Sequence, residues 1–252
     1  MSSQSISSVD ELDPESSRLI PIICYPRFSD AEYSERMAEI KSLGVTALIV
    51  GNGRSIVNGI SIAGKGWVGL VLKAKIGDRT CALKIRRVDA DRKDMAAEAR
   101  IHAMANDAGV GPRLFGHTKN LISMEFADGP SIAEWIRSAS AADARRVALS
   151  VLLQCRLLDK AGIDHGELSR LGRHVIVTDD SPCIIDFESA SASRKTSNVT
   201  SAVQSLFLFG TVAGHMRKML SVDNARTISA LREYKESPTD AGFARVVDTL
   251  PI

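Results

Sequence analysis

The chain has 252 residues, which is enough for one bilobal domain or two small ones. Apolar residues make up 44% and charged residues 25% of the chain, which argues against wholesale disorder or a fibrous repeat. The 32 Lys and Arg against 30 Asp and Glu leave a formal net charge of +2, too small to indicate nucleic acid or membrane binding. No apolar run approaches the roughly 18 residues that a transmembrane helix needs. We therefore expect a globular protein with no membrane partner and at most an indirect connection to nucleic acid.

The N-terminal segment and the cysteines indicate the compartment. Residues 1–18 are polar and acidic, unlike a signal peptide, and predict a disordered tail. The four cysteines, at positions 24, 81, 155 and 183, lie mostly in apolar segments and never form a CxxC pair. This pattern is typical of reduced thiols, so we expect a cytoplasmic protein without disulfides or zinc.

Residues 19–55 are predicted to form an N-terminal extension. Ser29 and Glu32 have the spacing of a capping box and Gly44 supplies a stop, which predicts a helix over residues 30–43. Val45–Val50 is typical of a strand. The loop-rich stretch 51–59 marks the expected boundary with the main domain.

Residues 56–126 are predicted to be rich in β-structure. Segments 70–76 and 80–88, separated by a short Gly-containing turn, predict a hairpin whose second strand buries Cys81, Leu83 and Ile85 on one face and presents Ala82, Lys84 and Arg86 on the other. A helix is expected over residues 92–107, and another short strand over residues 121–126.

Residues 127–252 are predicted to be mostly helical. A long helix should begin after Ser140 and end before Gly162. A second hairpin is expected from residues 175–178 and 183–185, joined by a turn at residues 179–182. Further helices should begin near residues 200, 222 and 237–240. The expected fold class is therefore α+β, with a β-rich half followed by a helical half that contains one hairpin.

The glycines at 64, 66 and 69, followed by Val71, match the pattern GxGxxGxV. A glycine-rich turn between strands is the simplest interpretation, but three nucleotide-binding patterns compete with it. A Rossmann fingerprint needs a helix after the glycines and an acidic residue about twenty positions on, whereas a strand and Lys84 occur here. A P-loop is approached by residues 59–66, but Gly66 stands where Ser or Thr binds magnesium, and β-branched residues follow where a helix is required.

The third pattern is that of protein kinases, in which a glycine turn between two strands precedes a lysine on the next strand. Lys84 fits that position, because it shares a face with Ala82 and its ammonium group can contact the α- and β-phosphates of ATP. An acidic residue on the following helix should hold the lysine. Glu98 is the expected partner, and Asp94 is the second choice.

The second half of the chain carries three more segments in the order found in kinases. Met124-Glu125-Phe126 follows an apolar strand, as a hinge between lobes does. Asp164-His165-Gly166-Glu167-Leu168 follows the long helix, as a catalytic loop does. Ile184-Ile185-Asp186-Phe187 closes the second hairpin, as a magnesium-binding segment does. Together with the glycine loop and Lys84, this order over residues 60–190 resembles the protein-kinase-like superfamily. The resemblance implies a two-lobed kinase-like fold with a β-rich N-lobe over residues 56–126 and a reduced helical C-lobe over residues 127–252.

Within this superfamily, HGEL in place of HRDL resembles the small atypical kinases, which include the RIO kinases and the kinase subunit of the KEOPS complex. The chain is most similar to an archaeal family of predicted serine/threonine kinases. The runs that carry this similarity are Ile23–Arg27, Ala82–Arg87, Gly109–Pro112, Asp164–Ser169 and Ile185–Ser191.

The resemblance implies a role for each site residue. ATP would lie against Gly64, Gly66, Gly69, Val71 and Ala82, with Lys84 held by Glu98 and the adenine bonded to backbone groups of Glu125 and Ala127. Asp186 would bind Mg²⁺, with water and phosphate completing the coordination. Glu167 would position the acceptor hydroxyl. Lys84, Glu167 and Asp186 are thus the expected catalytic residues, with ATP and Mg²⁺ as cofactors.

Three departures from ordinary kinases bear on activity. Glu167 replaces an aspartate, and a carboxylate displaced by about 1 Å can cost about a hundredfold in rate. Gly172 stands seven residues after His165, where a magnesium-binding asparagine is expected; counting back from the strand places His174 there instead, and imidazole suits Mg²⁺ poorly. Glu188 replaces the glycine after Asp-Phe, and no APE sequence follows.

Three functions therefore remain open at this stage. The first is phosphoryl transfer from ATP to a Ser or Thr hydroxyl of an unidentified protein substrate. The second is an ATPase-type assembly factor or switch that acts on a partner complex. The third is a nucleotide-binding pseudokinase. All three require Lys84 and Asp186 to face one nucleotide.

Overall fold

The computed structural model describes residues 9–51, 53–179 and 181–252. The described chain has an α+β fold and divides into two compact units. Unit 1 comprises the residues up to Arg100 together with Arg113–Phe126, and unit 2 comprises Ile101–Pro112 and Ala127–Ile252. The helix α3 (Ala96–Asp107) spans the first division. Residues 101–112 therefore group with unit 2, which differs from the continuous segment 56–126 expected from the sequence.

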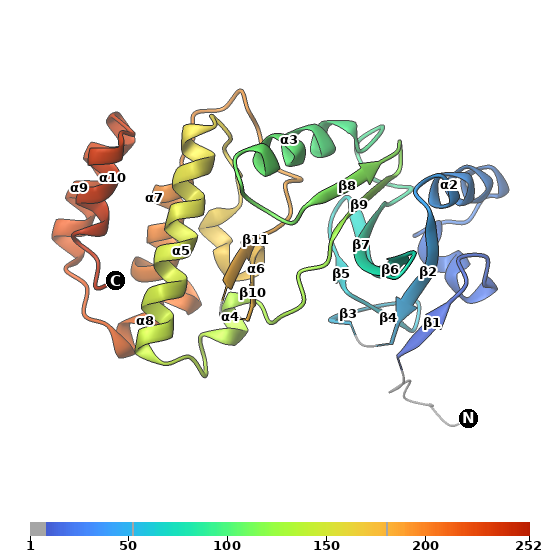
Figure 1. Cartoon of the computed structure of the whole chain (residues 1–252), viewed down its shortest axis with the longest axis horizontal. Coiled ribbons are helices and arrows are strands. Elements are labelled where there is room, and N and C mark those ends of the chain that lie inside the picture. The colour runs from blue at the N-terminus through green and yellow to red at the C-terminus, as the bar shows by residue number, and fades with distance from the viewer. Residues whose placement is uncertain (1–8, 52, 180) are drawn as a thin grey trace. The chain divides into compact units, whose positions relative to one another are not determined.

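Unit 1 is built around an antiparallel sheet (Figure 1). Seven strands form it within the described residues, in the order β1-β2-β6-β7-β9-β8, with β5 paired to β6. The strands are β1 (Asp10–Leu12), β2 (Val45–Val50), β5 (Gly64–Lys65), β6 (Gly69–Ile76), β7 (Arg79–Arg86), β8 (Leu114–His117) and β9 (Leu121–Glu125). A small hairpin of β3 (Ser55–Val57) and β4 (Ile60–Ile62), and the helices α1 (Ile20–Ile23) and α2 (Asp30–Ser42), complete the unit.

The N-terminal residues are more ordered than the sequence indicates. The prediction of a disordered tail over residues 1–18 is wrong for its described part, because β1 pairs with β2 and Ser17–Leu19 form a 3₁₀ turn; residues 1–8 lie outside the described residues. The charged side chains that favoured disorder form ion pairs, Arg18 with Asp10 at 2.9 Å and Lys75 with Glu11. Pairing with an existing strand supplies the backbone hydrogen bonds that the short acidic segment cannot supply alone.

The predicted extension over residues 19–55 is part of the same sheet. Strand β2 pairs with β6 along its length, and strand β3 begins inside the loop-rich stretch 51–59. Helix α2 is confirmed, with the Ser29 side chain accepting a hydrogen bond from the Glu32 backbone. Pairing between distant strands leaves no mark in the local composition. The sequence therefore suggested a boundary at a place where the flanking strands in fact belong to one sheet and one core.

The β6–β7 hairpin is confirmed, and its alternation of faces holds. Cys81, Leu83 and Ile85 belong to the main core of unit 1, and Ala82, Lys84 and Arg86 are buried on the opposite face. Helix α3 begins at Ala96 rather than at residue 92, because the Asp94 carboxylate accepts a hydrogen bond from the Ala96 backbone and starts the helix there.

Unit 2 is mostly helical, with the long helix α5 (Ala141–Lys160) buried along one side. The Ser140 side chain caps α5, and the helix ends before Gly162, as predicted. The hairpin of β10 (Val175–Thr178) and β11 (Ser181–Ile184) is also confirmed, although position 180 of its turn lies outside the described residues. The other helices are α4 (Ile132–Trp135), α6 (Leu171–His174), α7 (Asn198–Val203), α8 (Gly210–Met219), α9 (Asn224–Glu236) and α10 (Asp240–Val247), with a 3₁₀ turn at Leu168–Arg170 and a π-helical turn at Gln204–Leu208.

All four cysteines are free thiols. Burial raises the pKa of Cys81 to about 11 and raises that of Cys24 and Cys155, so these thiols are protonated and unreactive at neutral pH. No helix in the described part of the chain combines the length and the apolar character needed to cross a bilayer.

Candidate functional site

The glycine-rich segment forms a tight hairpin between β5 and β6. The Gly66 backbone donates to the Gly69 carbonyl at 2.8 Å, and Trp67 at the tip is 88% exposed. Lys65 lies on a strand and donates to the Tyr25 hydroxyl at 2.7 Å. A P-loop lysine must instead begin a helix, so the P-loop interpretation is wrong.

Gly69 sits directly against the lysine of the neighbouring strand. A Cβ atom at this position would lie 3.0 Å from the Ile85 carbonyl oxygen and 3.1 Å from Lys84 Cγ. A side chain there would crowd the lysine stem. Local packing therefore explains why the third position of the motif is a glycine, whether or not a ligand binds there.

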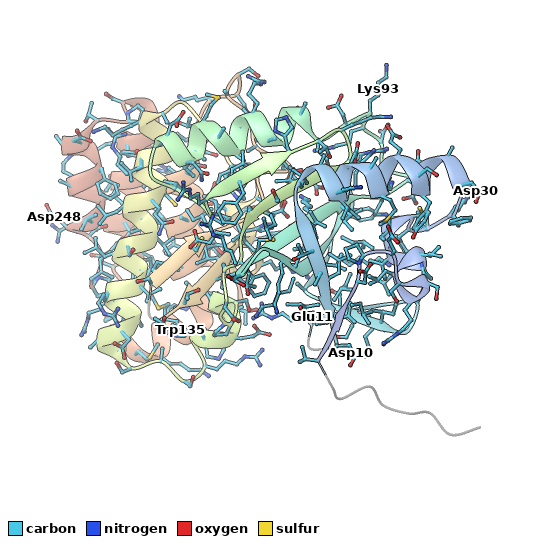
Figure 2. All side chains as sticks on the ribbon, turned by 45° about the vertical axis from the view of Figure 1, so that its right-hand side comes forward. Asp10, Glu11, Asp30, Lys93, Trp135 and Asp248 are labelled. Atoms are coloured by element: carbon cyan, nitrogen blue, oxygen red, sulfur yellow. The ribbon has the colours of Figure 1, made fainter. Side chains whose placement is uncertain are left out.

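Lys84 forms a buried ion pair with Glu98. Lys84 Nζ and Glu98 Oε1 are 2.7 Å apart, and both side chains are 4% exposed. Arg92 Nη1 lies 3.5 Å from the second carboxylate oxygen of Glu98. Lys93, by contrast, is exposed and extends away from the ribbon (Figure 2). The predicted pairing of Lys84 with Glu98 is confirmed, and Asp94, the second choice, is exposed and bonds to its own helix start.

The residues beside Lys84 form one face of the sheet. Val71 lies opposite Lys84 in the β6–β7 ladder, and Ile122 lies opposite it in the β7–β9 ladder. Ala82 lies two residues before Lys84 on the same face and opposite Met124. This face combines small and apolar side chains with two buried cations, Lys84 and Arg86.

Glu125 and Ala127 flank the passage from unit 1 to unit 2. Glu125 is exposed at the end of β9, and its backbone donates to the Arg113 carbonyl at 2.8 Å. Its carboxylate accepts a hydrogen bond from the Arg113 backbone at 3.3 Å. Ala127 begins the second segment of unit 2. Both residues lie at the connection that the sequence indicated as a hinge.

Elsewhere in unit 1, a surface depression of about 590 Å³ lies at the β6–β7 turn, lined by Ile76, Asp78, Arg79 and Phe115. It contains none of the predicted site residues.

In unit 2, Asp164 anchors the segment that resembles a catalytic loop. Its carboxylate accepts hydrogen bonds from Arg194 Nε at 2.6 Å and from the Ser197 backbone and hydroxyl at 2.9 and 3.0 Å. Its backbone forms a two-bond bridge with Ser191. The side chain is 95% buried within these contacts, so Asp164 holds the loop in place.

His165 is completely buried and links this loop to the segment before Asp186. Its Nδ1 accepts from the Glu167 backbone at 3.4 Å, so Nε2 carries the proton and donates to the Ile185 carbonyl at 3.0 Å. Burial lowers the pKa of His165 to about 4, so the ring is neutral at pH 7. His165 therefore packs under the loop as a structural residue.

Glu167 lies partly exposed beside its loop. Its carboxylate accepts from the Ser189 hydroxyl at 3.2 Å and lies 3.6 Å from Arg170 Nη1. Gly166, which precedes it, has φ of +86°, and a Cβ there would meet the Ser189 carbonyl oxygen at 2.8 Å. The glycine thus permits the sharp turn that presents Glu167.

Asp186 and His174 lie side by side at the base of the β10–β11 hairpin. Asp186 Oδ2 is 3.9 Å from His174 Nδ1, and the Asp186 side chain is 37% exposed. Burial lowers the pKa of His174 below its ordinary value, against the opposing effect of Asp186. The structure thus brings His174, rather than Gly172, next to Asp186, as counting back from the strand predicted.

Phe187 fixes the backbone next to Asp186. Its ring is 1% exposed, stacks on His102 at 5.0 Å and lies 5.4 Å from His165. Gly111 makes room for it, because a Cβ there would lie 2.7 Å from the ring. Asp186 itself has φ of +70°, a conformation that non-glycine residues adopt rarely and that this packing maintains.

In unit 2 a divalent cation would find one carboxylate, Asp186, beside one imidazole nitrogen, Nδ1 of His174. In the part of the chain that the structure describes, no three His, Cys, Asp or Glu side chains are grouped to hold a metal. Mg²⁺ usually keeps several waters and takes one or two carboxylates together with phosphate oxygens. A single carboxylate, Asp186, is compatible with that mode of binding.

Comparison with known proteins gives one family relationship. No protein-family model matches the chain. The uncharacterized protein MJ1211 of Methanocaldococcus jannaschii is 32% identical over 111 residues, which are 94% of that protein and 44% of this chain. The chain belongs to the MJ1211 family. Since the name of this relative states no activity, the function of the present MJ1211-family protein has to be argued from its own side chains.

Several residues that organise the site were not singled out from the sequence. They are His102, Gly111, Arg194, Ser197 and Asn198. Asn198, for example, accepts from the His165 backbone at 2.9 Å and is 1% exposed. Gly111 and Asp164 occur in runs that carried the resemblance, but the buried contacts of this MJ1211-family chain join segments 30 or more residues apart and have no periodic signal.

Proposed function

We propose that the protein is an ATP- and Mg²⁺-dependent phosphotransferase with a kinase-like fold, acting as an atypical serine/threonine protein kinase. The observation that carries the proposal is the buried Lys84–Glu98 ion pair beside Gly69. Such a pair contributes little net stability, because desolvation of the two charges offsets their attraction. Its presence next to a glycine hairpin is explained if the lysine is held ready for phosphate oxygens.

The proposed roles are those that the resemblance to kinases implies. Gly64, Gly66 and Gly69 would let backbone amides approach the phosphates, and Val71 and Ala82 would contact the adenine ring, whose edge would bond to backbone groups of Glu125 and Ala127. Lys84 would bind the α- and β-phosphates. Asp186 would hold Mg²⁺, and Glu167 would accept the proton of the acceptor hydroxyl. The acceptor would be an unidentified cytoplasmic protein or partner complex.

A second candidate is favoured by the surroundings of Glu167. Its carboxylate already accepts from Ser189 and lies near Arg170. A carboxylate that is already hydrogen-bonded to its own chain has to exchange that contact before it can meet a substrate hydroxyl. ATP would then be hydrolysed in an assembly switch, or bound without turnover in a pseudokinase.

The deciding experiment follows the γ-phosphate of labelled ATP in the presence of Mg²⁺. We expect label on protein with the wild type and its loss in both Asp186→Asn and Glu167→Gln. The exposed Asp248 (Figure 2) and Glu236 supply matched controls, because Asp248→Asn and Glu236→Gln make the same chemical changes away from the site. Free phosphate without labelled protein would support the ATPase. Nucleotide binding with neither product would leave the pseudokinase.

A further inference from the structure

His174 carries an unusual buried nitrogen. Its Nδ1 atom is buried and has no hydrogen-bond partner among the described residues. Leaving a buried polar atom without a partner is unfavourable, and a ligand bound to that atom would remove the cost. A carboxylate oxygen, Oδ2 of Asp186, lies 3.9 Å from this nitrogen, which is beyond hydrogen-bond distance.

Both side chains are fixed by the same hairpin. Val175 pairs with Ile184, and the Ile185 backbone donates to the His174 carbonyl at 2.9 Å. His174 and Asp186 therefore lie just outside the last pair of the hairpin, His174 at the end of α6 and Asp186 two residues after β11. The buried ring of Phe187 holds the Asp186 backbone from the other side. The nitrogen and the carboxylate thus lie 3.9 Å apart on backbone that the fold holds in place.

We propose that His174 Nδ1 and the Asp186 carboxylate together coordinate a divalent first-row transition-metal ion, in preference to Mg²⁺, in the nucleotide site. The inference rests on the proposed function and changes the identity of the ion that accompanies ATP.

The separation and the donor types support a shared ion. Bonds of about 2.0–2.2 Å from one ion to a nitrogen and to an oxygen place neighbouring donors about 3.0–3.5 Å apart, so the two side chains, now 3.9 Å apart, would have to approach by only about half an ångström to share an ion. Mg²⁺ demands near-ideal octahedral geometry and oxygen ligands, whereas imidazole nitrogen suits transition metals. Phosphate oxygens and water would fill the remaining positions.

Mn²⁺ is the appropriate probe, because it is paramagnetic and binds both oxygen and nitrogen donors. Among the divalent first-row metals, Mn²⁺ generally binds a given site most weakly. A site that prefers Mn²⁺ to Mg²⁺ should therefore prefer the other metals of the series as well. The protein would be loaded with the β,γ-methylene analogue of ATP, whose phosphate bridge contains no nitrogen, and with either Mn²⁺ or Mg²⁺. Titration calorimetry would measure affinity, and electron spin echo spectroscopy would detect ¹⁴N coupled to Mn²⁺.

The wild type should show ¹⁴N coupling and tighter binding with Mn²⁺ than with Mg²⁺. His174→Asn restores an oxygen donor, and we expect it to lose the ¹⁴N signal and to reduce the Mn²⁺ preference by at least about tenfold. His215→Asn is the matched control, since His215 Nδ1 contacts the Thr211 carbonyl on α8, and it should behave as wild type.

Three outcomes would overturn the inference. Absence of ¹⁴N coupling in the wild type excludes His174 as a ligand, and an equal metal preference in His174→Asn does the same; both leave the proposed function intact if the analogue binds. Failure of the analogue to bind with either ion overturns the inference and the proposed function together.

Discussion

At the scale of single residues, substitutions of Lys84 and Glu98 can test separately how the ion pair affects stability and how it affects nucleotide binding. Removing one charge of a buried pair leaves the other uncompensated, so Glu98→Gln should lower the free energy of unfolding by about 3–5 kcal/mol. Replacing both, as Lys84→Met with Glu98→Leu, should recover most of that loss, because two apolar side chains need no partner. Urea unfolding measures both changes in stability. Calorimetry with ATP measures whether nucleotide binding is lost.

The double variant distinguishes the two roles. We expect it to fold but to bind ATP at least tenfold more weakly than the wild type, with exposed Glu236→Gln as the control. If the double variant binds ATP as the wild type does, the ion pair is structural only.

His165 predicts how stability depends on pH. Burial lowers its pKa to about 4 in the folded chain, against an ordinary value near 6.5 when unfolded. Between these values the unfolded chain binds the extra proton, so stability rises with pH, is fully present above about pH 6.5 and is lost as pH falls toward 4. The contribution of this one residue is about 3 kcal/mol.

Urea unfolding at pH 7.0 and 4.5 tests the prediction by comparing the wild type with His165→Gln. The glutamine variant should be less stable at pH 7 and should lose less stability on acidification. Equal losses in both proteins would show that His165 does not titrate in this range.

At the scale of elements, the glycine hairpin offers a matched pair of substitutions. A Cβ at Gly69 would meet the Ile85 carbonyl oxygen at 3.0 Å, whereas a Cβ at Gly64 meets only Val71 Cβ, at 3.8 Å. Gly69→Ala should therefore cost about 1–3 kcal/mol of stability through crowding. Gly64→Ala should change stability by less than about 0.5 kcal/mol. Urea midpoints measure both, and equal effects would contradict the steric argument.

The elements also show what the sequence could predict. Helix α2, helix α5 and the two hairpins β6–β7 and β10–β11 were predictable, because caps, glycine stops and alternation are local signals. Strand β1 was not, because its order depends on pairing with β2, which lies more than thirty residues away. The start of α3 was predicted four residues too early, at residue 92. Composition alone suggested a helix there, but the hydrogen bond to the Asp94 carboxylate sets its start at Ala96.

The same division applies to the candidate site. The pairing of Lys84 with Glu98 and the position of His174 followed from strand alternation and from counting along a hairpin. The network of Asp164 with Arg194 and Ser197, and the packing of Phe187 against Gly111, could not follow in this way. Both depend on tertiary contacts between irregular segments, and such contacts produce no periodic pattern in the sequence from which they could be predicted.

At the scale of the whole molecule, the described residues form separate cores. Every member of the large apolar cluster around α5 belongs to unit 2, and every member of the cluster on β6 and β7 belongs to unit 1. Leu152 on α5 and Leu72 on β6 are both completely buried, one in each cluster. A cavity made in one cluster therefore removes contacts from that cluster alone.

Leu152→Ala and Leu72→Ala should each lower the free energy of unfolding by about 2–5 kcal/mol. We expect faster amide hydrogen exchange only in the unit that carries the change, because its own core supplies the lost contacts. The double variant should be additive within about 0.5 kcal/mol. If Leu152→Ala accelerates exchange in the β6–β7 ladder as strongly as in α5, the two units unfold as one cooperative body and their cores are energetically coupled.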